Sequence, residues 1–277
     1  MDQKNKPIKL SNSQKDVYEL CPYKYYLYYI KKYRSTIQGS ALLMGNAFDE
    51  ALNDLLINRD LNKAKEIFTN IWLSHKDKQI EYYAKDSLVD HSPFDSLLIK
   101  GIKCLESYYE HILPKIKNVV SVQEKINLTA SLEEGANEPD SITGIIDFIG
   151  TIEYEGKEYT GIFDNKTTSS PYPKNSVVKK EQLPLYAYCK DEYDYQGYLT
   201  VNKHTYETQI IIDTIPLDRK LEVIDKFDKI LNDIKENEFP KNKKGCWSFG
   251  KKCIYYSHCH EGGEFSSDIY QEVKEEE

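Results

Sequence analysis

Residues 141–168 read SITGIIDFIGTIEYEGKEYTGIFDNKTT and predict two β-strands joined by a tight turn. Isoleucine, phenylalanine, threonine and tyrosine dominate both runs, and these β-branched and aromatic residues favour strands. The sequence Glu155-Gly156-Lys157 between them predicts the turn of an antiparallel hairpin. Charged side chains interrupt the apolar runs, with Asp147 in the first and Asp164 and Lys166 in the second.

These charged residues are the candidate site. Because side chains alternate along a strand, Asp164 and Lys166 project from one face about 6 to 7 Å apart, while Asn165 points the other way. Antiparallel pairing brings Asp147 toward Asp164. Paired carboxylates suit Mg²⁺ or Mn²⁺, and a lysine beside the attacking water stabilises the charge that develops on a phosphate. The pattern therefore predicts metal-dependent hydrolysis of phosphodiesters.

A structural alternative remains open at this point. An acid-x-Lys tripeptide is expected several times by chance in a chain with 45 acidic residues, so a simple ion pair at a strand end explains it equally well. The placement of Asp164 and Lys166 at the end of an apolar run favours a site.

Working outward from the hairpin, the flanking sequence alternates between helical and strand patterns. Residues 11–30 predict a helix that begins with a capping pair, Ser13 and Asp16, and is interrupted at Cys21-Pro22. Residues 41–113 show helical spacing, with one predicted core face formed by Leu42, Phe48, Leu52, Leu55 and Leu56. The other expected elements are a strand at 119–130, a helix at 181–190, strands at 195–201 and 208–212, and a helix at 217–237.

Length and composition predict one domain of the α/β class. The 277 residues are 40% hydrophobic and 30% charged, as in ordinary globular proteins. We expect a mostly helical region at 1–115, a mixed α/β core at 116–240, a cysteine-rich segment at 241–262 and a frayed acidic tail at 263–277. No apolar run approaches the roughly 18 residues of a membrane helix, and no signal peptide is recognisable, so we expect a cytoplasmic protein without a membrane partner.

The net charge of −8 argues against a protein that coats nucleic acid through a broad basic surface. A local run of lysines, formed by Lys241, Lys243, Lys244, Lys251 and Lys252, is either a solvated loop or a surface that faces phosphates. The stretch from Gly245 to Lys251 has the spacing of a phosphate-binding loop. Lys252 stands where such a loop needs serine or threonine, so we expect no nucleotide cofactor.

Four cysteines lie near the chain ends: Cys21, Cys246, Cys253 and Cys259. In a reducing compartment they are better explained as metal ligands than as disulfides, whereas Cys104 and Cys189 resemble buried side chains. The late segment must therefore fold against the N-terminal helix. The spacing C-x6-C-x5-C lacks the tight knuckles of most zinc sites, which favours an iron-sulfur cluster, although zinc remains open, with His258 or His260 as substitute ligands.

The motifs together resemble the RecB-like branch of the PD-(D/E)XK nucleases, in its iron-sulfur subgroup. The resemblance covers residues 10–260 and rests on Ile-Thr-Gly-Ile-Ile-Asp147, Gly-Ile-Phe-Asp164-Asn-Lys166-Thr, Gln182-Leu-Pro-Leu-Tyr186, Leu10-Ser-Asn-Ser-Gln14, Cys21-Pro-Tyr-Lys-Tyr-Tyr26 and the three late cysteines. It implies a restriction-endonuclease-like core with a mixed central sheet flanked by helices, a helical N-terminal region and an iron-sulfur lobe.

The resemblance also implies a role for each matching residue. Asp147, Asp164 and the backbone carbonyl of Asn165 would bind Mg²⁺ or Mn²⁺, and Lys166 would position or activate water. Asp49 replaces the histidine of the usual Gly-x-x-x-His motif and is either a further metal ligand or a helix-surface acid. Glu124 matches a glutamate of the first strand, Gln182 and Tyr186 would line the DNA path, and Cys21, Cys246, Cys253 and Cys259 would hold a [4Fe-4S] cluster.

The activity implied is exonucleolytic hydrolysis of single-stranded or frayed DNA ends, with a helicase or recombination protein as a possible partner. Two other hypotheses remain open. The chain could be a DNA-binding or scaffold protein that keeps the fold and the cluster without cleaving, or a structural protein stabilised by zinc.

Overall fold

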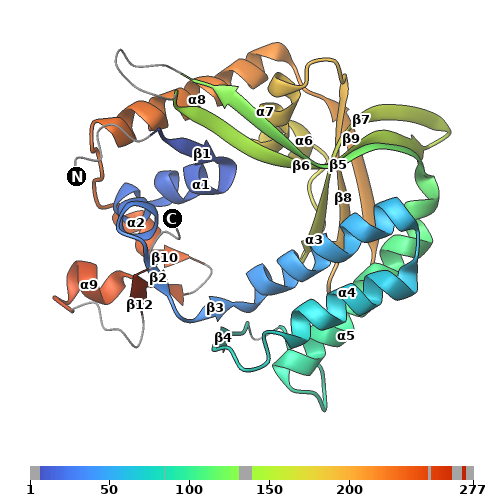
Figure 1. The fold of residues 1–277 in the computed structure, drawn as a ribbon, viewed down its shortest axis with the longest axis horizontal. Helices are drawn as coiled ribbons and strands as arrows, with labels where there is room; N and C mark the ends of the chain where they lie inside the picture. Colours follow the sequence, from blue (N-terminus) through green and yellow to red (C-terminus); the bar gives the residue numbers. More distant parts are fainter. Residues whose placement is uncertain (1–6, 84, 131–138, 249–250, 264–269, 273–277) are drawn as a thin grey trace. The chain divides into compact units, whose positions relative to one another are not determined.

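The computed structural model describes residues 7–83, 85–130, 139–248, 251–263 and 270–272 (Figure 1). The chain forms two compact units. Unit 1 comprises Met1–Ile37, Asn127–Gly144 and Ile224–Glu277, and unit 2 comprises Gln38–Ile126 and Ile145–Val223. Strands β5 (Ile116–Thr129) and β6 (Ser141–Tyr154) and helix α8 (Leu217–Lys235) each run from one unit into the other.

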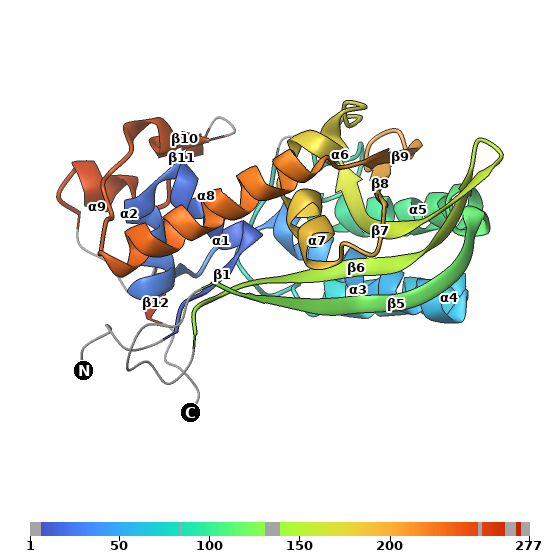
Figure 2. The same ribbon diagram turned by 90° about the horizontal axis from the view of Figure 1, so that it is seen from above.

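A mixed sheet forms the centre of the fold, in the order β1-β6-β7-β8-β9, with β5 paired to β6 (Figure 2). Its remaining strands are β1 (Lys9–Ser11), β7 (Lys157–Thr168), β8 (Tyr195–Asn202) and β9 (Thr208–Thr214). β6 and β7 are antiparallel, β7 and β8 parallel, and β8 and β9 antiparallel. This sheet with its flanking helices confirms the predicted mixed α/β class.

The predicted hairpin is present with a shorter turn than expected. Lys157 already pairs with Tyr154, so only Glu155 and Gly156 form the turn. Both have positive φ, 51° and 75°, which matches the two-residue turn that fits the twist of antiparallel strands.

In unit 2, three helices cover one face of the sheet and a pair of helices lies on the other. The first group is α3 (Ser40–Asn58), α4 (Leu61–Leu73) and α5 (Pro93–His111), and the second is α6 (Ser176–Lys179) and α7 (Gln182–Cys189). The buried core on the first face joins apolar residues of α3, α4 and α5 to Phe148, Phe163 and Leu199 of the sheet. Short elements complete the unit: β3 (Gln38–Gly39), β4 (Ile80–Glu81) and the 3₁₀ turn η3 (Leu113–Lys115).

Unit 1 contains both chain ends. Its elements besides the shared ones are α1 (Asn12–Leu20), α2 (Pro22–Tyr25), the π-helix η2 (Tyr26–Ile30), β2 (Tyr33–Ser35), η4 (Lys243–Cys246), β10 (Trp247–Ser248), β11 (Lys251–Lys252), α9 (Tyr256–His260) and β12 (Tyr270–Glu272). The hydroxyl of Tyr18 donates to the carbonyl of Glu238 at 2.6 Å, and the side-chain amide of Asn242 donates to the carbonyl of Leu20 at 3.0 Å. The prediction that the late segment folds against the N-terminal helix is confirmed.

Several local predictions were wrong. Ser11, not Ser13, caps α1, because its side chain accepts from the N–H of Gln14 while the Gln14 side chain accepts from the N–H of Ser11. Leu42 is 59% exposed and does not join the core face of α3. The acidic tail was expected to be frayed, but Gln271 and Glu272 belong to β12, which pairs with β2; residues 264–269 and 273–277 lie outside the described part.

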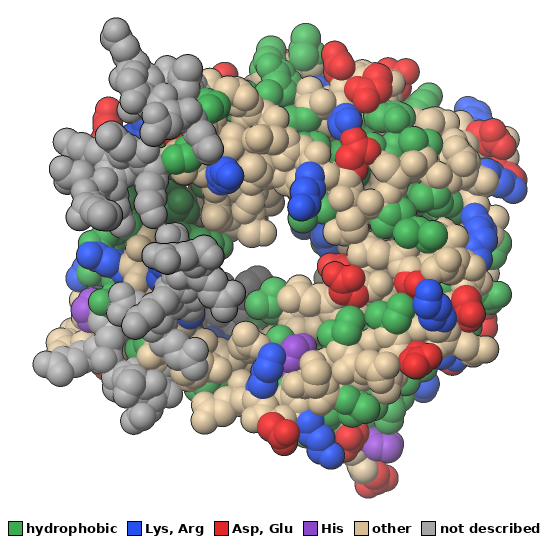
Figure 3. Space-filling view, in the orientation of Figure 1, with side chains coloured by type: hydrophobic (Ala, Val, Ile, Leu, Met, Phe, Trp, Pro, Cys, Tyr) green, Lys and Arg blue, Asp and Glu red, His purple; other side chains and the backbone are tan. Residues whose placement is uncertain are grey.

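The distribution of charged side chains and the character of the helices fit a chain with 30% charged residues. Acidic and basic side chains are interspersed over the face of unit 2 that Figure 3 shows. Among the described residues, none of the helices combines the length and the apolar character that crossing a bilayer requires.

Candidate active site

The candidate site lies where strands β6 and β7 separate. Their antiparallel ladder ends at the pair Phe148 and Phe163, whose stacked rings pack in the core. Asp147 and Asp164 are the next residues on either strand. Because side chains alternate, both acids project from the face opposite to the two phenylalanines.

One ammonium group joins the two acids. Nζ of Lys166 lies 2.7 Å from Oδ2 of Asp164 and 4.0 Å from Oδ2 of Asp147. The backbone N–H of Asn165 donates to Oδ2 of Asp147 at 2.7 Å. This hydrogen bond holds the Asp147 carboxylate of β6 against β7 at the point where the two strands separate. The structure therefore brings Asp147, Asp164 and Lys166 together, as predicted.

Helix α3 contains Asp49, whose ionisation is affected by the charges of this group. The pKa of Asp49 is raised to about 6, mainly by burial, while the charge of Lys166 lowers it and that of Asp164 raises it. The Asp49 carboxylate therefore lies within electrostatic range of Lys166 and Asp164. The interpretation of Asp49 as a further metal ligand stays a prediction.

The acidic side chains of the cluster have raised pKa values and outnumber the positive charge beside them. Burial raises the pKa of Asp147 well above its usual range, and the charge of Asp164 raises it further. Burial also raises the pKa of Asp164, although Lys166 opposes this. The pKa of Lys166 is raised because Asp164 and Asp147 outweigh the effect of its burial, so the ammonium stays protonated. Three carboxylates against one ammonium leave an excess of two negative charges when all are ionised.

Asp147 and Asp164 offer carboxylate oxygens to a divalent cation, while ligand oxygens of Asp49, Asp147 and Asp164 do not all lie within 4.8 Å of one another. Mg²⁺ and Mn²⁺ prefer carboxylate oxygens, and an ion of charge +2 would neutralise the excess. Asp164 has no exposed surface. The hydroxyl of Tyr198, on β8 in register with Asp164, is buried without a hydrogen-bond partner among the described residues. A buried donor without a partner is costly, so a polar group beside Asp164 is expected.

Gln182 and Tyr186 of helix α7 support the cluster. The side-chain amide of Gln182 donates to Oδ1 of Asp164 at 2.8 Å and approaches the Tyr186 hydroxyl at 3.1 Å. That hydroxyl donates to the carbonyl of Ile145 at 2.7 Å, and Tyr186 is only 3% exposed. The expectation that Tyr186 lines the DNA path does not match this burial; both residues instead orient Asp164 and strand β6.

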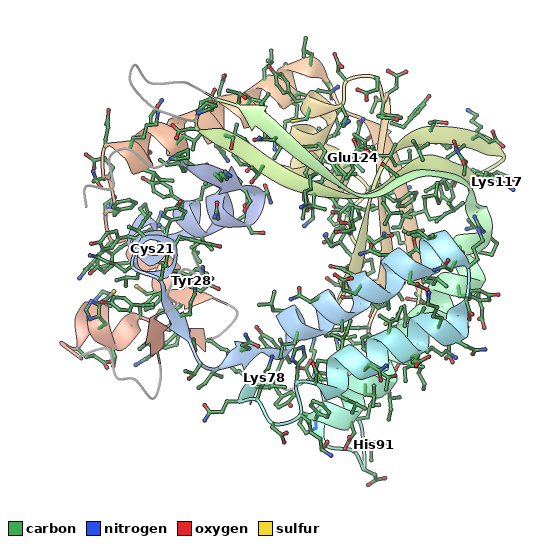
Figure 4. All side chains as sticks on the ribbon, viewed as in Figure 1. Cys21, Tyr28, Lys78, His91, Lys117 and Glu124 are labelled. Atoms are coloured by element: carbon green, nitrogen blue, oxygen red, sulfur yellow. The ribbon has the colours of Figure 1, made fainter. Side chains whose placement is uncertain are left out.

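The other predicted residues of unit 2 are placed differently. The side chain of Asn165 accepts from the hydroxyl of Tyr108 at 2.8 Å, on the α5 face of the sheet, as alternation predicts. Glu124 lies on β5 (Figure 4), where it forms an ion pair with Lys190 and accepts from the Ser121 hydroxyl at 2.6 Å. The structure therefore gives Glu124 partners outside the cluster.

Sequence reasoning missed three groups near the site. They are Tyr198 and Tyr108, described above, and Lys180, whose charge acts on Asp164. Lys180 also lies over the ring of Tyr172, 4.3 Å from its centroid. Only Lys180 carries a sequence signal, since it comes two residues before Gln182. The tyrosines approach the acids through packing between strands and helices, which sequence spacing does not reveal.

The four terminal cysteines line one pocket in unit 1. Cys21 lies between α1 and α2 (Figure 4), and Cys246, Cys253 and Cys259 come from η4 to α9. Burial raises the pKa of Cys253 and of Cys259, whereas Lys24 lowers the first and Lys241 the second. No three of these sulfur atoms, all of which lie in the described part of the chain, are within 4.8 Å of one another.

A glycine permits the approach of the late cysteines to Cys21. A Cβ atom at Gly245 would lie 2.4 Å from the carbonyl oxygen of Leu20 and 3.1 Å from Cβ of Cys21. His260 is close to the same group, with Nε2 3.2 Å from Sγ of Cys246. Of the remaining cysteines, Cys104 is buried as predicted, while Cys189 is partly exposed.

Comparisons with known proteins agree with this geometry. A family model described as the PD-(D/E)XK nuclease superfamily matches residues 9–260. None of the curated proteins matches the chain. Among solved structures, the crystal structure of SSO0001 is similar over 76% of this chain and 80% of that chain, with 11% sequence identity and a TM-score of 0.33.

Proposed function

Because the chain belongs to the PD-(D/E)XK nuclease superfamily, we propose that it is a divalent-metal-dependent deoxyribonuclease that degrades single-stranded or frayed DNA from its ends. One observation supports the proposal most directly: the carboxylates of Asp147 on β6 and Asp164 on β7 share the ammonium of Lys166, at 4.0 and 2.7 Å.

Four groups of the chain would hold Mg²⁺ or Mn²⁺, namely the carboxylates of Asp49, Asp147 and Asp164 and the backbone carbonyl of Asn165. A bound divalent ion supplies Lewis acidity at a phosphate oxygen and lowers the pKa of water. Gln182 keeps Asp164 in one orientation through its hydrogen bond to Oδ1, and the N–H of Asn165 does the same for Asp147.

Lys166 acts as a cation rather than as a base. In the metal-free protein the carboxylates of Asp164 and Asp147 raise the pKa of Lys166 and so favour the protonated ammonium. A fixed ammonium can donate hydrogen bonds to the attacking water and stabilise the negative charge that develops on the phosphate oxygens.

Cleavage of end-labelled DNA with Mn²⁺ tests this role. Lys166→Ala should lose at least about tenfold in rate, while retaining its fold by circular dichroism. Lys190→Ala is the matched control, because it removes a lysine that pairs with Glu124 outside the cluster. Equal rates for wild type and Lys166→Ala would remove Lys166 from the mechanism, and a wild type without any cleavage would favour the non-catalytic DNA-binding protein.

The preference for ends has its own test. An exonuclease degrades linear single-stranded DNA and leaves a single-stranded circle of the same sequence intact. Cleavage of the circle at a similar rate would show an endonuclease and would leave the metal-dependent chemistry unaffected.

We further propose that Cys21, Cys246, Cys253 and Cys259 hold a [4Fe-4S] cluster, as in the iron-sulfur subgroup of the RecB-like nucleases. The proposal is supported by the pocket that the four thiols share and by Lys24 and Lys241, whose charges favour thiolates. A single Zn²⁺ ion with Zn–S bonds of about 2.3 Å needs its sulfurs closer together than they lie here.

Metal analysis distinguishes the alternatives. Protein purified without oxygen should contain iron and show broad visible absorbance, and Cys21→Ser should lose both. Cys189→Ser is the control, since Cys189 lies outside the cysteine pocket. One equivalent of zinc in a colourless protein would contradict the cluster.

A further inference from the structure

Positive charge is concentrated in two stretches of unit 1. Residues 20–37 and 239–260 together contain nine lysines and arginines and no aspartate or glutamate, although the whole chain has a net charge of −8. The structure packs the two stretches together, because the backbone N–H of Tyr23 donates to the carbonyl of Pro240 at 3.3 Å. Segments from the two ends of the chain thus form one basic region.

Lysines of this region lie over aromatic rings. Nζ of Lys31 lies 5.5 Å from the ring centroid of Tyr26. Nζ of Lys241 lies 5.0 Å from the ring centroid of Tyr23. The rings of Tyr23 and Tyr26 are stacked, with their centroids 5.9 Å apart. Lys241 also donates to the carbonyl of Cys259 at 3.2 Å, which joins this first group to α9.

A second group surrounds Trp247. On β10, Trp247 pairs with Lys252 of β11, whose Nζ lies 5.9 Å from the indole centroid and 4.5 Å from that of Tyr256. Of the two tryptophans in the chain, Trp72 is buried, whereas Trp247 is 57% exposed. Lys252 also approaches Glu261 at 3.5 Å, but both side chains are about half exposed, and such surface pairs contribute little. The indole and the ammonium beside it therefore face solvent together.

We name these two groups of lysines and aromatic residues the lysine-aromatic surface. Single-stranded DNA presents phosphates, which lysines neutralise, and unpaired bases, which stack on aromatic rings. From the segregated charge, the lysines placed beside rings and the exposed indole, we infer that this surface binds single-stranded DNA. Trp247 stacks on a base, and Lys31 and Lys252 pair with phosphates. This inference rests on the proposed function and adds to it a surface of unit 1 that holds the strand.

Substitutions at position 247 separate stacking from other contacts. Trp247→Phe keeps an aromatic face, whereas Trp247→Leu keeps an apolar side chain without one. The Kd for fluorescein-labelled oligo(dT), measured by anisotropy without added divalent ions, should rise less than about twofold for Trp247→Phe and at least about fivefold for Trp247→Leu. Unlabelled oligo(dT) should quench the tryptophan fluorescence of the wild type. Trp247→Phe should abolish this quenching, because Trp72 is buried.

Salt dependence tests the lysines. Lys31→Ala and Lys252→Ala should each raise the Kd and reduce the slope of log Kd against log salt concentration by about 0.7. Lys229→Ala is the matched control, since Lys229 is an exposed lysine of unit 1 that lies on α8, outside both stretches. Positions 31, 247 and 252, all in the described part of the chain, do not line the cysteine pocket, so these variants should keep the metal content of the wild type. If Trp247→Leu lost metal, the two lysine variants would still decide.

The outcomes separate this surface from the proposed nuclease. Equal affinities of Trp247→Phe and Trp247→Leu, or a salt slope unchanged in both lysine variants, would overturn the inference and leave the nuclease intact. Competition by poly-L-glutamate or by duplex DNA as effective as that by oligo(dT) would also overturn it, because the surface would then bind any polyanion, an acidic protein included. A wild type that binds oligo(dT) through this surface but cleaves no DNA would refute the nuclease alone, and one that neither binds nor cleaves would refute both.

Discussion

The side-chain amide of Gln182 donates a 2.8 Å hydrogen bond to Oδ1 of Asp164, and the other oxygen of that carboxylate lies 2.7 Å from Nζ of Lys166. Asp164 is thus held from helix α7 on one side and from its own strand on the other. Because Asp164 is fully buried, its orientation depends on these two contacts.

Removing the donor at position 182 should impair catalysis without unfolding the protein. Gln182→Met keeps the length of the side chain and loses the amide, so Asp164 gains freedom to rotate. We expect about a tenfold loss in kcat for DNA cleavage, equivalent to about 1.4 kcal/mol, with KM changed much less. Gln209→Met, which alters an amide that bonds to the backbone of Tyr172, is the control. Unchanged kcat in Gln182→Met would exclude the positioning role.

The stability of the metal-free protein should depend on the ionisation of Asp49. Its pKa is about 6 in the folded state, above the ordinary value, so the folded state binds the proton more tightly than the unfolded state does. Asp49 therefore does not lower the free energy of unfolding below about pH 4, where it is protonated in both states. As the pH rises from about 4 to about 6, the free energy of unfolding falls by about 3 kcal/mol in total. Asp49→Asn should be more stable than wild type at pH 7.5 and lose that advantage at pH 4.5. Urea unfolding in EDTA measures the difference, and an equal difference at both pH values would contradict the assignment.

Divalent ions should offset the destabilisation that the ionised acids cause in the metal-free protein. If Mn²⁺ binds only the folded state, an ion concentration one hundred times the Kd raises the free energy of unfolding by about 2.7 kcal/mol. Tm rises accordingly. Asp147→Asn should abolish the increase, because it removes a ligand from the cluster. Differential scanning fluorimetry with and without EDTA is sufficient, and Glu124→Gln, whose partners lie outside the cluster, should respond like wild type.

Two buried tyrosines of the site should differ in what their hydroxyls contribute to stability. Tyr186→Phe leaves the carbonyl of Ile145 without its donor and should cost about 1–2 kcal/mol. Tyr198→Phe removes a hydroxyl that has no partner among the described residues and should cost less than about 0.5 kcal/mol. Urea denaturation in EDTA separates the two variants. A cost for Tyr198→Phe equal to that of Tyr186→Phe would show that its hydroxyl has a partner.

Gly245→Ala should disturb the cysteine pocket. The new Cβ would lie 2.4 Å from the carbonyl of Leu20, so the segment that carries Cys246 must move away from Cys21. We expect at least about 2 kcal/mol of destabilisation and a lower metal content per chain. Gly263→Ala is the matched control, because its nearest neighbour would be at an ordinary 3.4 Å. Full metal content in Gly245→Ala would argue against the close approach.

Local sequence patterns predicted much of the fold. The bounds of β6 were predicted without error, and the order of the main helices and strands was confirmed. Errors arose where two local signals compete, as at the cap of α1, where Ser11 and Ser13 both offer a hydroxyl. Leu42 fits the apolar period of α3, yet its side chain is 59% exposed.

The sequence alone determined the hairpin and the presence of Asp147, Asp164 and Lys166 on it, because alternation along a strand and a two-residue turn are local properties. Tertiary structure decided which groups complete the site. Gln182 contacts Asp164 because α7 packs on the face of the sheet from which Asp164 projects, and the hydroxyl of Tyr198 is buried beside Asp164 because β8 pairs in register with β7. These relationships depend on how whole elements pack together, which the spacing of residues along one element does not specify.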